Sequence, residues 1–234
     1  MYIVTVIPAR GGSKSIPRKN IVKLGGYPLI KYSIDYSLES DLVNQTIVST
    51  DDDEIASIAL DMGADVPFKR PYKLAEDDVP DFPVIFHALQ ELEKDLDGMI
   101  DIIILLRPTS PLRPKGLIEE AVSMLENNPK ASSVRAMTKS KEHFYRQWKK
   151  DGDYIQSFVE DQSVHEPYNI PRQFLPNSYF QTGDIEVIRR STLINGSVSG
   201  DFVLPLMIDS EAVFDIDHTN DLSLAEKKVN DEKS

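Results

Sequence analysis

A glycine-containing basic loop directly follows the first apolar segment of the chain. It spans Arg10–Asn20 and reads RGGSKSIPRKN. Paired glycines let backbone N–H groups approach a ligand closely, and Arg10, Lys14 and Lys19 add the positive charge that a triphosphate requires. A basic surface turn is the alternative, and the spacing fits neither a Walker A loop nor a GxGxxG loop. Because ligands in open α/β sheets bind beyond the carboxyl ends of strands, the position of the loop favours phosphate binding.

A second loop with polar and cationic side chains spans Leu106–Arg113 and reads LRPTSPLR. It follows the strongly apolar run IDIIILL. Its two prolines stiffen the backbone, and its hydroxyl and guanidinium groups can orient a polar, anionic substrate. A plain strand-to-helix turn explains the prolines equally well, so both interpretations stay open.

Two aspartates, Asp215 and Asp217, lie two residues apart near the end of the chain. Carboxylates at this spacing in an extended segment share a face, where both can hold a Mg²⁺ that bridges phosphates. Since Mg²⁺ prefers one or two carboxylates together with substrate phosphates, a triphosphate loop in the same chain makes this pair the metal candidate. The acidic run Asp51–Glu54 is instead typical of a helix start.

Short apolar runs alternate with segments of helical periodicity, and these elements must position the candidate residues. The apolar runs predict strands at residues 2–9, 46–50, 64–68, 100–106, 132–137, 183–188 and 203–208. Helical spacing of apolar residues predicts helices within residues 28–38, 55–62, 84–96, 114–125 and 220–230. Strands that alternate with helices of this length indicate an α/β sheet with parallel crossovers.

The alternation breaks after Met137. Residues 138–178 are polar, aromatic and turn-rich, and they lack clean periodicity. We interpret them as an excursion, either a hairpin subdomain or a subunit contact, within a single domain over residues 1–234. A length of 234 residues agrees with one globular domain.

Composition and charge exclude several classes of protein. Cysteine is absent, which excludes disulfides and thiolate zinc sites and fits a reducing cytoplasm. The net charge of −12 argues against nucleic acid and anionic membranes as partners, and no apolar run is long enough for a transmembrane helix. Residues 1–34 differ from this average, because they contain six basic and no acidic residues. A triphosphate cradle best explains that local charge.

Five motifs occur in this order and together cover most of the chain: IPARGGSKSIPRKNI (7–21), VSTDD (48–52), LLRPTSPLR (105–113), PRQFLPNSYFQTGDIEVIRR (171–190) and FDIDHTNDL (214–222). With these motifs the chain resembles the cytidylyltransferases that make CMP-activated nonulosonic acids. These are the CMP-sialic acid synthetases (acylneuraminate cytidylyltransferases) and their legionaminic and pseudaminic relatives. The resemblance implies a Rossmann-like three-layer α/β/α nucleotidyltransferase fold with a largely parallel, mixed sheet, and a homodimer formed through the excursion.

The resemblance also implies a reaction and roles for individual residues. CTP would condense with a nine-carbon acid sugar to give the CMP-sugar and pyrophosphate, with Mg²⁺ or Mn²⁺ as the metal. We expect Arg10, Lys19 and Asp217 to be catalytic. The other matches are Ser13 and Lys14 in the triphosphate loop, Asn20 at the cytosine ring, Arg70 and Asp81 at the nucleotide, Arg107 and Arg146 near the sugar, Arg172 reaching the partner's active site, and Asp215 and Asp217 on the metal.

Three positions depart from the family pattern. Arg107 stands where sialic acid synthetases commonly have glutamine, residues 182–184 read TGD in place of NGA, and Asp81 stands where serine is frequent. The first two fall near the sugar, so the identity of the acid sugar stays open. The third lies at the nucleotide and leaves the identity of the nucleobase open. The alternatives are a nucleotidyltransferase for another NTP or another sugar (Kdo-like or a sugar phosphate), and a catalytically silent nucleotide-binding relative.

Overall fold

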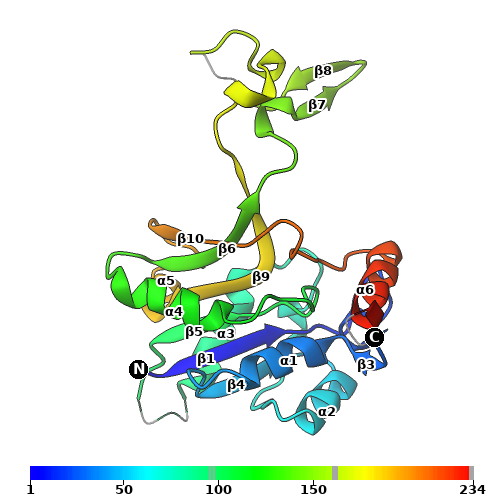
Figure 1. Cartoon of the computed structure of the whole chain (residues 1–234). Helices are drawn as coiled ribbons and strands as arrows, with labels where there is room; N and C mark the ends of the chain where they lie inside the picture. The colour runs from blue at the N-terminus through cyan, green and yellow to red at the C-terminus, as the bar shows by residue number, and fades with distance from the viewer. Residues whose placement is uncertain (95, 97, 160–162, 232–234) are drawn as a thin grey trace.

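The computed structural model describes residues 1–94, 96, 98–159 and 163–231. Within these residues a six-stranded sheet forms the centre of the molecule (Figure 1). β1 pairs in parallel with β4 and β5, and β6 with β10, whereas β9 runs antiparallel between β5 and β6. The predicted mixed, largely parallel sheet is confirmed. From edge to edge the strands are β10 (Val203–Met207), β6 (Ser133–Lys139), β9 (Tyr179–Arg189), β5 (Ile102–Leu105), β1 (Ile3–Pro8) and β4 (Gln45–Ser49).

Helices cover both faces of the sheet and complete the three-layer α/β/α fold. Strand residues such as Ile3 and Ile104 face α1, α2 and α4, whereas Val6 and Ile103 face α3 and α5. This division follows from the alternation of side chains along a strand. No helix in the described part of the chain combines the length and the apolar character needed to cross a lipid bilayer. The helices are α1 (Ile30–Leu38), α2 (Asp53–Asp61), α3 (Asp81–Leu92), α4 (Leu117–Asn127), α5 (Arg190–Ile194) and α6 (Thr219–Asp231).

A third, smaller apolar cluster joins the segments that carry the candidate residues. α6 packs through Ala225 and Val229 against Ile16 of the basic loop and Ile216, which lies between the two aspartates. The same cluster includes a residue of the short hairpin of β2 (Lys23–Leu24) and β3 (Tyr27–Pro28). The terminal helix therefore holds the first and the last motif of the chain together.

The predicted strand at residues 64–68 is wrong. In the described part of the chain only an isolated bridge between Ile47 and Asp65 connects this segment to β4. Asp65 exchanges backbone hydrogen bonds with Thr46 and Val48, at 2.8 and 2.9 Å. Pro67 follows two residues later and has no backbone N–H group, so the ladder does not continue.

The chain leaves the sheet between β6 and β9. There β7 (Trp148–Asp151) pairs with β8 (Tyr154–Ser157) in an antiparallel hairpin that projects away from the sheet (Figure 1). Extended pairing of Lys139 with Tyr179 forms the base of the projection. Its exposed apolar side chains include Tyr154, Ile155, Phe158 and Phe174.

Candidate active site

A cavity of about 520 Å³ lies at the edge of the sheet where β1 and β5 end. It brings together residues from the basic loop, the segment before α3, the loop after β5 and the last aspartate pair. Asp215 does not line the cavity; it lies two residues before Asp217, and its side chain is hydrogen-bonded to Thr109, which does line it. The predicted site residues that line the cavity are Arg10, Ser13, Lys14, Lys19, Asn20, Arg70, Asp81, Arg107 and Asp217.

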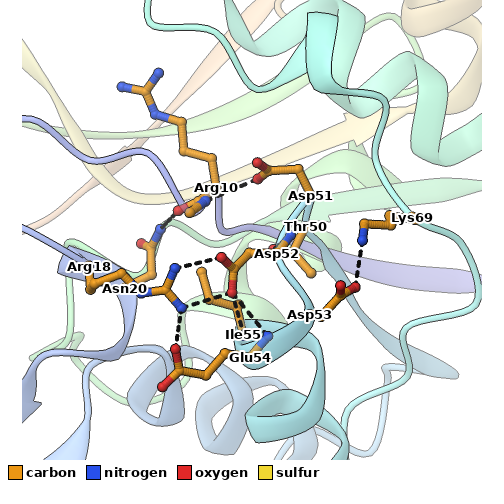
Figure 2. Close-up of polar contacts among 11 residues, drawn as sticks. Arg10, Arg18, Asn20, Thr50, Asp51, Asp52, Asp53, Glu54, Ile55 and Lys69 are labelled. Carbon is orange, nitrogen blue, oxygen red and sulfur yellow. Dashed lines mark hydrogen bonds and ion pairs between the residues drawn. The ribbon is translucent and has the colours of Figure 1, made fainter.

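Side-chain hydrogen bonds shape the basic loop (Figure 2). The backbone of Arg18 has a φ of 57°. Its guanidinium donates to both carboxylate oxygens of Asp52 at 2.5 and 2.9 Å and to Glu54 at 2.6 Å. Asp52 also caps α2, accepting from two backbone N–H groups of the first turn. The amide of Asn20 donates to the carbonyl of Arg10 at 2.9 Å. The start of α2 thus anchors the loop, and the Arg10 side chain points away from this cluster (Figure 2).

The local positive charge of residues 1–34 is therefore divided between structure and cavity. Arg18 is neutralised by Asp52 and Glu54, and Lys31 pairs with Asp35 at 2.8 Å on α1. Arg10, Lys14 and Lys19 line the cavity. The assignment of this whole charge to a triphosphate cradle is too broad, because part of it stabilises the loop and α1.

The close approach of the loop to α2 requires glycine at position 11. A Cβ atom there would lie 2.7 Å from Oδ2 and 3.0 Å from Cβ of Asp52, whereas a Cβ at Gly12 would meet nothing within 4 Å. Arg18 and the helix cap hold Asp52 in place, so it cannot yield. We expect Gly11→Ala to lower the free energy of unfolding by about 1–3 kcal/mol and Gly12→Ala to leave it unchanged. Equal thermal unfolding midpoints for the two variants would contradict this packing argument.

One carboxylate neutralises two cations of the loop. Asp77 contacts Nη2 of Arg10 at 2.8 Å through one oxygen and Nζ of Lys14 through the other. Lys14 and Arg10 hold the pKa of Asp77 below its usual range, so the carboxylate is ionised at neutral pH. Arg10 also donates to the carbonyl of Ala75 at 3.4 Å. The segment before α3 therefore closes on the loop, a contact that sequence patterning did not reveal.

Lys19 and the aspartate pair meet at the other end of the cavity. Nζ of Lys19 lies 3.2 Å from Oδ1 of Asp217 and donates to the carbonyl of Ile216 at 3.1 Å. The backbone N–H of Ile216 donates to the carbonyl of Thr109 at 2.8 Å, and its side chain is fully buried. Asp215 and Asp217 flank this anchor, so the basic loop, the loop after β5 and the aspartate pair converge.

The aspartate pair fits a magnesium ion held jointly with a nucleotide. The described residues contain no group of three or more His, Cys, Asp or Glu side chains able to hold a metal ion. Two carboxylates do not fill an octahedral shell, and Mg²⁺ characteristically takes its remaining ligands from water and substrate phosphates. Asp215 and Asp217 beside a cationic loop supply that kind of donor set.

Two buried arginines, Arg70 and Arg113, position the cavity walls. Burial lowers the pKa of Arg70 to about 10, so it stays protonated at neutral pH, and it donates to the carbonyl of Ser49 at 2.5 Å. Arg113 donates to the carbonyls of Arg107 and Asp184, each at 2.5 Å. Arg113 thus ties the loop after β5 to β9, a role that its place in LRPTSPLR did not reveal.

Arg146 and Arg172 lie in the excursion and do not line the cavity. Arg146 donates to the carbonyl of Ile170 at 3.1 Å, and Arg172 begins a short, exposed 3-10 helix. Arg107, in contrast, lines the cavity and contacts two carboxylates, Asp81 at 2.5 Å and Glu186 at 2.7 Å. The cavity of a single chain therefore gathers the residues predicted for the triphosphate and the nucleotide together with Asp217, whereas Asp215 and the two arginines of the excursion do not line it.

Comparisons with known proteins identify the family of the chain. Residues 4–195 match the cytidylyltransferase family. A pseudaminic acid cytidylyltransferase from Campylobacter jejuni subsp. jejuni serotype O:2 is 31% identical, and the match covers 100% of both chains. A CMP-N,N'-diacetyllegionaminic acid synthase from the same source is 31% identical over 96% of this chain and 93% of its own.

A solved structure has the same fold. It is a CMP:2-keto-3-deoxy-manno-octonic acid synthetase complexed with CTP, with a TM-score of 0.73 at 17% identity, and the match covers 99% of this chain and 100% of that one. The family match extends over most of the chain, and relatives above 30% identity span its whole length. This chain therefore belongs to the cytidylyltransferase family, and within it to the CMP-nonulosonic acid synthetases that its motifs resemble.

Proposed function

We propose that this enzyme transfers the cytidylyl group of CTP to a nonulosonic acid, giving a CMP-sugar and pyrophosphate. The observation that carries the proposal is one cavity lined by three loop cations and by Asp217, which Lys19, one of the three, contacts at 3.2 Å. The relatives named above act on pseudaminic and legionaminic acids, which are acid sugars of this class. Family membership and cavity chemistry therefore support the same reaction.

The triphosphate would lie along Arg10, Lys14 and Lys19. Charge-assisted hydrogen bonds from cations to phosphate oxygens are roughly twice as strong as neutral ones, and Ser13 adds a hydroxyl donor. Asn20 and Arg70, on the same wall of the cavity, would contact the nucleoside. The acid sugar would enter from the side of Arg107, where β9 passes the loop after β5.

In the reaction, the anomeric hydroxyl group gives up its proton to the surrounding water and its oxygen bonds to the α-phosphorus. The bond from the α-phosphorus to the oxygen that bridges to the β-phosphorus breaks, and pyrophosphate leaves. Arg10 and Lys19 would stabilise the charge that develops on the departing pyrophosphate, and positioning would lower most of the barrier. Asp215 and Asp217 would hold Mg²⁺, which when bound supplies further positive charge to the phosphate oxygens. Lys19 also fixes Asp217 relative to the basic loop.

We also propose a homodimer formed through residues 138–178. The excursion carries exposed aromatic and aliphatic side chains on a segment that has few contacts with its own sheet. Pairing would bury them and would bring Arg146 and Arg172 to the cavity of the partner. Light scattering coupled to size-exclusion chromatography tests this, and a monomer at the assay concentration would contradict it.

Asp77 competes with the triphosphate for two of its cations. We expect Asp77→Asn to lower the KM for CTP by about two- to tenfold, because exposed ion pairs of this kind are weak and their loss frees both cations for the triphosphate. The difference should shrink at high salt, since screening weakens exposed charge pairs. Asp78→Asn, at the exposed neighbouring position, is the control and should behave like the wild type. A raised KM in Asp77→Asn would show that the carboxylate assists binding.

Pyrophosphate release with each of the four common NTPs tests the proposed reaction. With Mg²⁺ and a nonulosonic acid, we expect release with CTP and not with ATP, GTP or UTP. Release with a different NTP would assign the protein to another nucleotidyltransferase activity. No release with any NTP and any acid sugar would indicate a catalytically silent relative.

A further inference from the structure

Two oppositely charged side chains that line the cavity bind each other. Asp81 is the first residue of α3, and Arg107 follows β5. Nη2 of Arg107 donates to Oδ2 of Asp81 at 2.5 Å and to Oε1 of Glu186, on β9, at 2.7 Å. These partners are 26 and 79 residues away along the chain. The contact thus joins three segments beside the proposed sugar and nucleotide positions.

The charges around Arg107 balance in two pairs. Glu186 is fully buried, and its second oxygen accepts from Nε and Nη2 of Arg135 at 2.9 and 2.6 Å. Arg135 therefore matches the charge of Glu186, and Asp81 matches that of Arg107. Removing Asp81 or Arg107 alone leaves one unmatched charge in partly buried surroundings, whereas removing both leaves none.

The pair leaves one carboxylate oxygen free for a ligand. The Asp81 side chain is 44% exposed, and among the described residues none donates a hydrogen bond to its Oδ1. An ionised carboxylate only accepts hydrogen bonds. Because Arg107 holds Oδ2, the orientation of the free oxygen is fixed relative to the cavity.

We propose that Asp81 and Arg107 act as one specificity element. Oδ1 of Asp81 recognises a neutral N–H or O–H donor of the substrate, and Arg107 positions that carboxylate. The inference rests on the proposed function, because the ligand is taken to be CTP with an acid sugar. Such a donor has two sources in these substrates, the amino group of cytosine and a hydroxyl or acylamino group of the sugar.

A double-mutant cycle tests the coupling. Asp81→Ser and Arg107→Gln, each alone, should lower kcat/KM about tenfold or more. In the double variant, the loss in kcat/KM should be about two- to a hundredfold smaller than the product of the two single losses. The matched control is the ion pair of Glu93 and Arg190, which is 2.7 Å long and does not line the cavity. Glu93→Ser and Arg190→Gln should change the unfolding midpoint and leave kcat/KM unchanged.

Substrate selectivity separates recognition from a purely structural role. In Asp81→Ser and in the double variant, the ratio of CTP to UTP affinity, measured by calorimetry, falls if the donor is the cytosine amino group. The ratio of kcat/KM for an acylamino nonulosonic acid to that for Kdo changes if the donor belongs to the sugar. Unchanged ratios would overturn the proposal, whether or not the single losses are multiplicative.

Calorimetry also separates this inference from the proposed function. If the wild-type protein binds CTP without releasing pyrophosphate, the proposed reaction is contradicted. The ratios of CTP to UTP affinity in the variants then still test whether Asp81 and Arg107 recognise the substrate. A wild type that turns over CTP with variants of unchanged selectivity contradicts only the specificity element. A wild type that binds neither nucleotide overturns both.

Discussion

Replacing Lys19 by alanine is expected to lower kcat/KM by about 30- to 1,000-fold, equivalent to about 2–4 kcal/mol of transition-state stabilisation. The Lys19 side chain is 14% exposed, and its ammonium lies between the basic loop and Asp217, 3.2 Å from that carboxylate. In the proposed reaction, a cation held there would stabilise charge as it develops on the departing pyrophosphate. Alanine removes the charge and also the link between the first and last motifs.

Lys23→Ala is the matched control for this prediction. Lys23 is an exposed lysine four residues further along the chain, on β2, and it does not line the cavity. Steady-state kinetics with CTP and the acid sugar should leave this control near the wild type, and thermal unfolding should show that both variants fold. Near-wild-type turnover in Lys19→Ala would remove Lys19 from the mechanism.

Asp217→Asn should lower Mg²⁺-dependent turnover by more than about a hundredfold, because it removes the charge of a proposed metal ligand. Loss of a residue that only supports a metal ligand already lowers metal affinity or activity by about 10- to 100-fold. The side chain is 63% exposed, so the fold should be unaffected. The measurement is kcat against Mg²⁺ concentration, with Asp201→Asn, at an exposed position outside the cavity, as the control. An active Asp217→Asn enzyme with an unchanged Mg²⁺ requirement would contradict the metal assignment.

Elements with strong local signals could be predicted from the sequence. β1 and β5 are continuous apolar runs because helices cover both of their faces, and α2 begins where Asp52 caps it. These signals act within a few residues, so one sequence contains them. The segment 64–68 (ADVPF) is also mostly apolar, but Pro67 has no backbone N–H group, and only a single bridge to β4 forms. The apolar pattern therefore predicted a strand that the missing backbone N–H group does not allow.

Contacts between distant segments could not be predicted. Asp77 meets Arg10 and Lys14 only because the segment before α3 folds over the basic loop. Arg107 meets Glu186 because β9 runs antiparallel to β5 in a register that places Glu186 opposite Leu105. Neither the direction nor the register of β9 follows from its own residues. The resemblance to a family pointed to several residues that line the cavity, among them Arg10, Lys19 and Asp217, and also to Arg146 and Arg172, which do not. The structure was needed to find which lining residues neutralise each other.

The most direct test of the proposed reaction is a product analysis with purified protein, CTP, Mg²⁺ and a panel of nonulosonic acids and Kdo. We expect at least one nonulosonic acid to give a CMP-sugar and pyrophosphate in equal amounts, detected by mass spectrometry and by phosphate NMR. Kdo should be a poorer acceptor than that acid. Pyrophosphate without a CMP-sugar, or no product with any nonulosonic acid in the panel, would contradict the proposed function.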